Sequence, residues 1–230
     1  MKNIIPGHQH PTIKFIEDSV DYFKKQGFAV ALGNEIEDEW YNFDFLRVAK
    51  DHPARDLQDT FWLKNGKLLR THTSTLQGRV TRDIGLLPPL KVIAPGRVYR
   101  NEATDSSHEA IFTQMEGFVI GKNITMANLM YVISDFLKNM LGEVETNFYP
   151  HHYPFVEPGM DVSIKWQGKW LEVLGSGMIH PEVISNMGYD PDIWQGFAFG
   201  FGVDRLTMLK TGIKDIRTLY HPDFRMIYQF

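Results

Sequence analysis

Strand-like segments in this sequence come in hairpin pairs, and this pairing constrains the fold more than any other feature. Asn65-Gly66 stands between two apolar runs, and this dipeptide is a strong signal for a tight hairpin turn. A second hairpin is expected around Gln167-Gly168, between extended runs at 160–166 and 170–174. Hairpins favour an antiparallel sheet, whereas a dinucleotide fold shows regular strand–helix–strand alternation. The sequence therefore predicts an α+β fold in which helices flank an antiparallel sheet.

Two amphipathic segments with apolar residues at three- and four-residue spacing predict helices at 11–27 and 125–141. A proline opens the first segment, a threonine caps the second, and a glycine stands at or just after the end of each. In the first helix we expect the buried face to consist of Ile13, Ile16, Val20 and Phe23.

Composition excludes several classes of protein. The chain has 230 residues and no cysteine, so disulfides and thiolate zinc sites are impossible. Its formal charge of −4 argues against a domain that binds nucleic acid by itself, so such contacts must be local or made through a partner. No apolar run approaches the ~20 residues that span a bilayer, and residues 1–10 are not a secretory signal. We expect a cytoplasmic protein with one domain, 1–230, because no linker-like stretch divides the chain.

The first candidate site is a strand–loop–strand segment at 97–118. Alternation along strands puts Arg100 and Glu102 on one face, and it puts Gln114 and Glu116 on one face of the partner strand. Arginine binds phosphate through two parallel N–H donors, so this arrangement suits a nucleotide. A salt-bridged hairpin exposed to solvent explains the same residues equally well.

A glycine-interrupted segment at 196–202 is the second candidate. Its three glycines allow a ligand to approach the backbone closely. Arg205 then falls at the start of a helix, where the helix dipole disfavours a cation, and this placement suggests a bound anion nearby. The alternative is a tightly packed core strand.

Two smaller clusters complete the candidates. His72, Ser74 and Gln77 are polar hydrogen-bonding residues that follow an expected strand, but a helix cap with exposed neighbours is the simpler interpretation. Tyr153 and Phe155 are two residues apart, so in an extended segment both rings face one side and form a wall for a flat apolar group. Two core aromatics explain that pattern at least as well.

Taken in order, these segments resemble the catalytic domain of the alpha subunit of phenylalanyl-tRNA synthetase, a class II aminoacyl-tRNA synthetase family. The resemblance runs from about residue 7 to residue 230. It places motif 1 at about 11–36, motif 2 at about 96–118 and motif 3 at about 196–209. The matching segments are His52–Arg55, Asp59–Trp62, Leu68–Ser74, Pro95–Arg100, Gln114–Gly117, Trp170–Gly175 and Gly196–Gly200.

The resemblance implies an aminoacyl-tRNA ligase that activates L-phenylalanine with ATP and transfers it to tRNA(Phe). Arg100 is then expected to hold the α-phosphate and the amino-acid carboxylate, and Arg205 to hold the γ-phosphate. These two are the expected catalytic residues. Glu102 and Phe112 would contact the adenine of ATP, and His108 its outer phosphates.

The resemblance also implies an amino-acid pocket and a metal ligand. The residues expected to surround phenylalanine are His72, Thr73, Ser74, Gln77, Gln114, Glu116, Tyr153, Phe155 and Ala198. Glu157 matches a Mg²⁺ ligand that bacterial enzymes share with the beta subunit, so Mg²⁺ is the expected metal.

Four features depart from the family pattern. Asn34 stands where motif 1 has a proline, Tyr153 where the pocket has a phenylalanine, and Asp204 where motif 3 has a glutamate. The family's N-terminal coiled coil, which helps to hold tRNA, does not precede motif 1 in this sequence.

The expected partners are phenylalanine, tRNA(Phe) and a beta subunit in a heterotetramer. The alternative is a stand-alone paralogue, a homodimer, that activates phenylalanine or a related amino acid without charging tRNA by itself. A non-catalytic amino-acid or nucleotide sensor is a third hypothesis. The presence of both Arg100 and Arg205 argues against it, because a sensor need not keep two arginines that hold phosphate.

Overall fold

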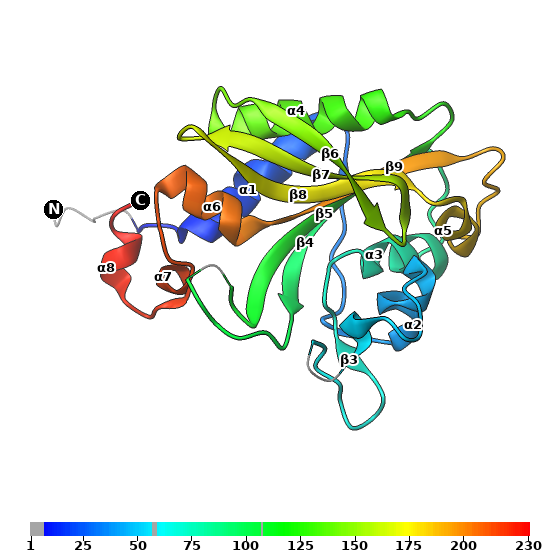
Figure 1. Ribbon diagram of the computed structural model, residues 1–230, viewed down its shortest axis with the longest axis horizontal. Helices are drawn as coiled ribbons and strands as arrows, with labels where there is room; N and C mark the ends of the chain where they lie inside the picture. Colours follow the sequence, from blue (N-terminus) through cyan, green and yellow to red (C-terminus); the bar gives the residue numbers. More distant parts are fainter. Residues whose placement is uncertain (1–6, 57–58, 107) are drawn as a thin grey trace, which may run out of the picture.

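A computed structural model describes residues 7–56, 59–106 and 108–230. In these residues seven strands form one sheet in the order β1-β4-β5-β9-β8-β7-β6 (Figure 1). β1 runs parallel to β4, and the other neighbouring pairs are antiparallel, as the α+β prediction requires. The strands are β1 (Ala29–Val30), β4 (Leu90–Tyr99), β5 (Ile111–Gly121), β6 (Thr146–Tyr153), β7 (Val156–Trp166), β8 (Lys169–Ile179) and β9 (Gln195–Gly202).

Three helices pack together against one face of this sheet: α1 (Pro11–Lys25), α4 (Met126–Leu141) and α6 (Val203–Thr211) (Figure 1). The remaining elements of the described residues are short. They are β2 (Ile36–Glu37), which pairs with β3 (Leu68–Leu69), and the helices α2 (Glu39–Asn42), α3 (Thr75–Gly78), α5 (Pro181–Asn186), α7 (Arg217–Tyr220) and α8 (Phe224–Ile227), with 3₁₀ turns at Asp44–Leu46 and Pro53–Arg55 and a π-helical turn at Arg79–Asp83.

Capping residues set the ends of the two long helices as predicted. Pro11 opens α1, and Gly27 follows it with φ of 84°. Thr125 and Asn128 form a reciprocal capping box at the start of α4, and Gly142, with φ of 87°, ends it.

The predicted buried face of α1 is confirmed at Phe23, and Ile16 and Val20 pack against the core, but the prediction is wrong at Ile13. Ile13 is 46% exposed, whereas Phe15, Ser19, Tyr22 and Phe23 are buried. The helix turns its aromatic residues inward because a Phe or Tyr ring removes more apolar surface from water than an Ile side chain does. Tyr22 also donates a hydrogen bond to Asp135 of α4, at 2.5 Å, which joins the two helices.

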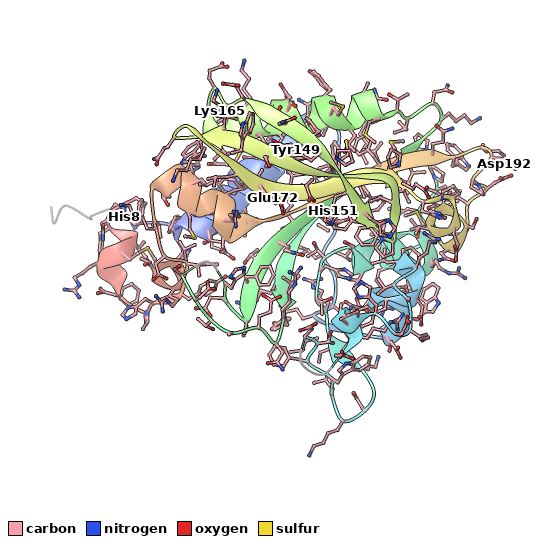
Figure 2. The ribbon with its side chains drawn as sticks, viewed as in Figure 1. His8, Tyr149, His151, Lys165, Glu172 and Asp192 are labelled. Atoms are coloured by element: carbon pink, nitrogen blue, oxygen red, sulfur yellow. The ribbon has the colours of Figure 1, made fainter. Side chains whose placement is uncertain are left out.

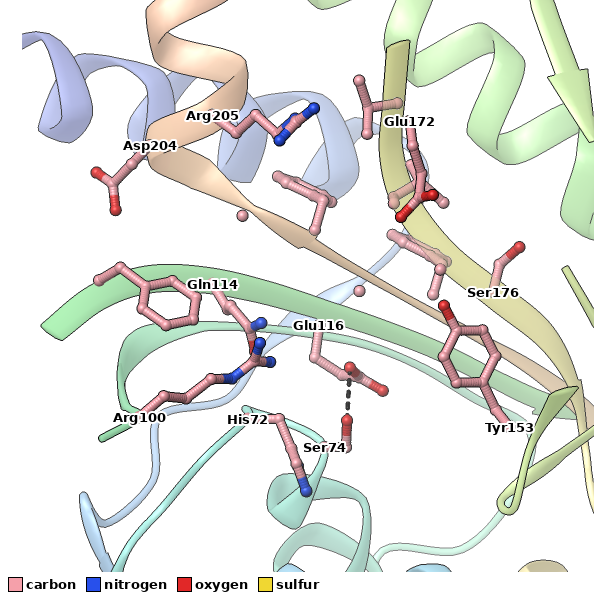
Figure 3. Close-up of a pocket in the computed structure, with 18 of the residues that line it drawn as sticks. His72, Ser74, Arg100, Gln114, Glu116, Tyr153, Glu172, Ser176, Asp204 and Arg205 are labelled. Carbon is pink, nitrogen blue, oxygen red and sulfur yellow. Dashed lines mark hydrogen bonds between the residues drawn. The ribbon is translucent and has the colours of Figure 1, made fainter. Parts of the chain in front are cut away.

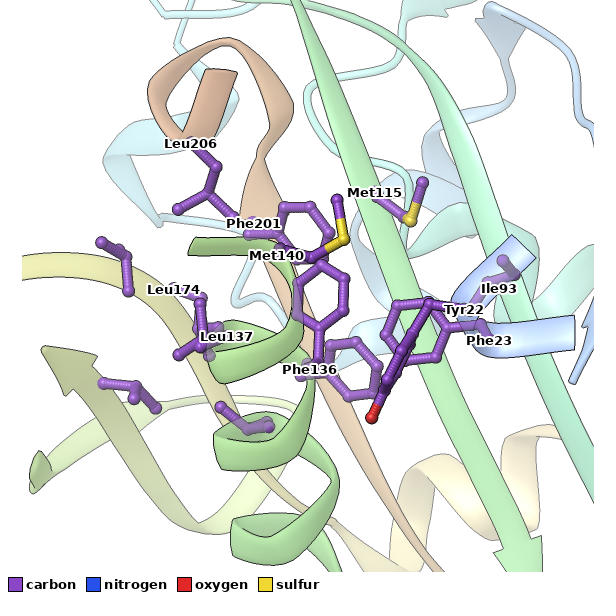
Figure 4. Packing of buried hydrophobic residues seen from close by; sticks show 14 of the residues in the cluster. Tyr22, Phe23, Ile93, Met115, Phe136, Leu137, Met140, Leu174, Phe201 and Leu206 are labelled. Atoms are coloured by element: carbon purple, nitrogen blue, oxygen red, sulfur yellow. The ribbon is translucent and has the colours of Figure 1, made fainter. Parts of the chain in front are cut away.

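The alternation of phenylalanine and small residues along β9 gives the sheet two different faces. Phe197, Phe199 and Phe201 pack into the helix-side core, where Phe201 lies 5.0 Å from Phe136 between ring centroids (Figure 4). The intervening residues, Gly196, Ala198, Gly200 and Gly202, face the other way. The glycine-rich strand is therefore tightly packed on one face, whereas on the other it packs closely at Gly196 and Ala198 and leaves space near Gly200 and Gly202.

In the described part of the chain, no helix has both the length and the apolar character needed to cross a membrane.

Candidate active site

A cavity of about 710 Å³ lies over the small-residue face of β9 (Figure 3). Strand register places Gly200 of β9 between Gly175 of β8 and Glu116 of β5. A Cβ atom at Gly200 would lie 2.9 Å from Oε2 of Glu116. Gly200 therefore presents bare backbone beside Glu116, which lets a ligand lie close to the sheet, whereas Gly175 lies under the Tyr153 ring.

Glu116 is the buried acid of this cavity. It is 5% exposed and accepts a hydrogen bond from Ser74 Oγ at 2.9 Å (Figure 3). It accepts a second hydrogen bond from Gln77 Nε2 at 2.7 Å. The salt bridges among the described residues do not include it. Burial without a cation raises the pKa of Glu116 from 4.5 to about 7. A ligand cation beside this carboxylate would restore its charge.

The segment 72–77 is more than a helix cap. Ser74 precedes α3, but its side chain makes no capping bond and instead holds Glu116. Gln77 also holds Glu116 and is 1% exposed, so it supports the cavity from behind and does not line it. Thr73 is also buried away from the cavity, and its Oγ1 has no hydrogen-bond partner among the described residues.

His72 lines the cavity as a neutral imidazole. Burial, together with the nearby positive charge of Arg100, lowers the pKa of His72 to about 3. Its Nδ1 is buried and unpartnered among the described residues. His72 is therefore a neutral hydrogen-bonding group at neutral pH.

Arg100 and Phe112 lie together where β4 and β5 leave the sheet. The guanidinium of Arg100 lies 5.1 Å from the centroid of the Phe112 ring, and its Nε donates to the carbonyl of Thr71 at 3.2 Å. Both side chains line the cavity, with Gln114 beside them. Glu102 and His108 are on its exposed rim, where His108 Nδ1 lies 3.0 Å from Asp105 Oδ2.

Asp204 and Arg205 at the start of α6 have opposite orientations. Asp204 is buried and accepts hydrogen bonds from the Thr113 amide and the Tyr220 hydroxyl, each at 2.7 Å, so it anchors the helix to β5 and α7. Arg205 points over the cavity (Figure 3) and makes no ion pair with the described residues. An uncompensated cation at a helix N-terminus is expected where an anion binds.

Two aromatic rings form a side wall. Tyr153 and Phe155 have nearly parallel rings whose centroids are 5.6 Å apart, and both line the cavity. Ala198, 4% exposed, lies in the floor beyond them. The Tyr153 hydroxyl donates to Asp161 Oδ1 at 2.6 Å, so it has a partner within the protein.

Glu157 lies outside the cavity. Its carboxylate is 77% exposed and is 3.5 Å from His180 Nε2. Within the described residues no group of three or more His, Asp or Glu side chains is arranged to hold a metal ion. Mg²⁺ needs several oxygen ligands, so the described residues do not form a complete Mg²⁺ site at Glu157.

Sequence reasoning gave no role to Glu172 and Ser176 of β8, which both line the cavity. Glu172 lies across from Arg205 (Figure 3). The segment 170–175 was already part of the family resemblance, but alternation along a single strand does not say which neighbour each side chain will face.

Comparisons with known proteins relate this sequence to one family of enzymes. The family model described as tRNA synthetases class II core domain (F) matches residues 1–230. The phenylalanine–tRNA ligase alpha subunits of Acaryochloris marina and Synechocystis are each 45% identical over 97% of this chain and 67% of their own length. That of Clostridium perfringens is 45% identical over 97% of this chain and 69% of its length.

The fold, the cavity and the family match define a class II tRNA synthetase core. The chain belongs to the phenylalanine–tRNA ligase alpha subunit family, and it spans about two thirds of the length of these relatives.

Proposed function

We propose that this chain is the catalytic alpha subunit of a phenylalanine–tRNA ligase, which activates L-phenylalanine with ATP and transfers it to tRNA(Phe). The observation that carries the proposal is the distribution of charge in the cavity. Glu116, a buried acid without a cation among the described residues, shares the cavity with Arg100 and Arg205. An amino acid and a nucleotide together supply the ammonium and the phosphates that these three groups lack.

In the proposed complex the phenylalanine ammonium binds Glu116, and its carboxylate lies beside Arg100. His72, Ser74 and Gln114 would orient the amino acid. Its ring would lie between the aromatic wall and the floor at Ala198. This pose directs the carboxylate at the α-phosphorus of ATP.

The proposed first step forms a bond between a carboxylate oxygen and the α-phosphorus and breaks the bond to pyrophosphate, which leaves. Arg100 and Arg205 would balance the negative charge on the phosphates. Phe112, Glu102 and His108 would hold the adenine and the outer phosphates. Catalysis then consists of positioning and electrostatic stabilisation, without a covalent intermediate on the protein. In the second step a tRNA hydroxyl attacks the activated carbonyl, and AMP leaves.

The proposal includes a beta subunit. Glu157 would contribute one carboxylate to a Mg²⁺ site that the beta subunit completes, which accounts for its exposure on the surface. With a formal charge of −4, this chain has little general attraction for tRNA, so the partner would supply most of the tRNA contacts in a heterotetramer. A cytoplasmic location follows from this role.

The test is charging of tRNA(Phe) with phenylalanine, measured for the chain alone and after mixing with a phenylalanine–tRNA ligase beta subunit. We expect charging only in the mixture. Charging by the chain alone would contradict the need for a partner. Amino-acid activation that never leads to charging, with or without the beta subunit, would contradict the ligase proposal and support the stand-alone paralogue.

A further inference from the structure

Three polar side chains, Tyr153, Asp161 and His151, lie in contact behind the aromatic wall of the cavity. Tyr153 Oη donates to Asp161 Oδ1 at 2.6 Å, and Asp161 Oδ2 lies 2.9 Å from His151 Nδ1. The side chain of Asp161 is 15% exposed, whereas that of His151 is 50% exposed and lies near the end of β6 (Figure 2). The rings of His151 and Tyr153 are 4.6 Å apart between centroids. Asp161 therefore fixes the hydroxyl end of the wall, and His151 covers its outer side.

Two glycines give Tyr153 its position. The register of β7 and β8 pairs Asp161 with Gly175, and a Cβ atom at Gly175 would lie 2.6 Å from the Tyr153 hydroxyl oxygen. A Cβ atom at Gly159 would lie 3.4 Å from Cδ2 of the same ring. The β6–β7 pairing is irregular between His151 and Tyr153. The ring thus passes over bare backbone at Gly175 and reaches Asp161 on the far side.

We propose that Asp161 is a positioning residue that holds the ring of Tyr153 as the pocket wall and keeps its hydroxyl away from the amino-acid side chain. The inference rests on the proposed function and extends it to the selection of phenylalanine over tyrosine. A wall whose polar atom is already paired presents only a ring face to the substrate. Because the hydroxyl is held at Asp161, a substrate phenol would face the ring and not the hydroxyl, and a phenol left without a partner is disfavoured.

Removal of the Asp161 carboxylate should weaken the selection of phenylalanine over tyrosine. The Tyr153 hydroxyl loses its acceptor, and a half-buried hydroxyl seeks another partner. Other polar groups of the cavity, Arg100 and Glu172, lie close enough to interact with Tyr153 electrostatically. A ring that turns toward them moves the hydroxyl into the amino-acid site, where it can pair with a substrate phenol.

The test is a double-mutant cycle with Asp161→Ala, Tyr153→Phe and the double variant. The measurement is kcat and KM for phenylalanine and for tyrosine in ATP–pyrophosphate exchange, together with calorimetric binding of both amino acids. Asp161→Ala should lower the phenylalanine-to-tyrosine ratio of kcat/KM roughly tenfold, mainly by lowering KM for tyrosine. The double variant should have nearly the same phenylalanine-to-tyrosine ratio as Tyr153→Phe, because Asp161 acts on this ratio only through the Tyr153 hydroxyl.

Asp135→Ala is the matched control. Asp135 accepts a hydrogen bond from Tyr22 at 2.5 Å, but this pair joins α1 to α4 and does not line the cavity. Asp135→Ala also removes a hydrogen bond between a tyrosine and an aspartate, so an effect caused by a general loss of stability would appear in this variant as well. Its phenylalanine-to-tyrosine ratio should equal that of the parent.

Two results would overturn the inference alone. One is an active Asp161→Ala variant with the parental phenylalanine-to-tyrosine ratio of kcat/KM. The other is an effect of Asp161→Ala on this ratio that is equally large in the Tyr153→Phe background and in the parent. A parent that neither exchanges nor binds an aromatic amino acid would overturn the proposed function and this inference with it.

Discussion

Replacement of Glu116 by glutamine should make the protein more stable and less active, and the stability gain should depend on pH. Burial raises the pKa of Glu116 from 4.5 to about 7 in the folded protein. Below pH 4.5 the acid is protonated in both the folded and unfolded states. Between pH 4.5 and 7 the unfolded state loses the proton first, so the free energy of unfolding falls as pH rises. Above pH 7 the folded state carries the full free-energy cost of burying the ionised Glu116 carboxylate.

The magnitude follows from the two pKa values. A tenfold change in proton affinity corresponds to 1.36 kcal/mol, so a pKa of about 7 instead of 4.5 corresponds to about 3 kcal/mol. Glutamine has nearly the same shape and no charge. It can still be satisfied, because the terminal amide of Gln77 has a buried Oε1 without a partner and can present it after a flip. Relative to the parent, Glu116→Gln should therefore gain about 3 kcal/mol between pH 4.5 and pH 8.

The assay is urea unfolding of both proteins at pH 4.5 and pH 8. Glu172→Gln is the control, because it removes an exposed carboxylate that lines the same cavity and should change stability by less than about 0.5 kcal/mol. A parent-to-variant difference that is the same at both pH values would refute the reasoning. Glu116→Gln should also bind phenylalanine at least tenfold more weakly at pH 8, and unchanged binding would refute the ammonium assignment.

Three further predictions follow from the same cavity. Arg205→Ala should lower phenylalanine-dependent pyrophosphate exchange by about 10² to 10³, because an exposed cation of the cavity, proposed to hold the phosphates of ATP, is lost; near-normal exchange by the folded variant would refute its role. Ala198→Gly should widen the floor and admit para-chlorophenylalanine, and a kcat/KM for this analogue no higher than the parent's would show that Ala198 is not at the para position. Gly117→Ala should destabilise the fold by roughly 1–3 kcal/mol, because the new Cβ would lie 2.2 Å from Phe199 Cζ; an unchanged urea midpoint would contradict this packing.

Local signals in the sequence were sufficient for the elements that depend on local chemistry. Thr125 and Gly142 set the ends of α4, and the Asn65-Gly66 turn formed as predicted, with Leu63 N donating to Lys67 O at 2.8 Å. These signals work because a cap or tight turn is determined by residues within four positions of each other.

Long-range partners explain what sequence reasoning missed. The face of α1 was misassigned at Ile13 because periodicity does not say which side chains the neighbouring helices will cover. Ser74 was expected to cap a helix, but a buried carboxylate 42 positions away competes for its hydroxyl. Likewise, whether the Tyr153 hydroxyl points into the cavity depends on Asp161, on a different strand.

The order of the motifs in the sequence predicted most residues of the candidate site. The structure then distinguishes the residues that line the cavity from those that lie behind it or outside it. Glu116 and Arg100 line the cavity, whereas Gln77 and Thr73 are buried behind it and Glu157 is outside it. Spacing alone could not distinguish these positions, because a residue that touches a ligand and a residue that supports its neighbour occupy the same short segment.

The most direct test of the central claim is ATP–pyrophosphate exchange by the purified chain, with and without a beta subunit, in the presence of phenylalanine, tyrosine, leucine or no amino acid. We predict exchange that requires an amino acid and is fastest with phenylalanine. Arg205→Ala serves as the inactive reference. Exchange with none of the three amino acids, or exchange that favours tyrosine, would contradict the proposal that this cavity activates phenylalanine.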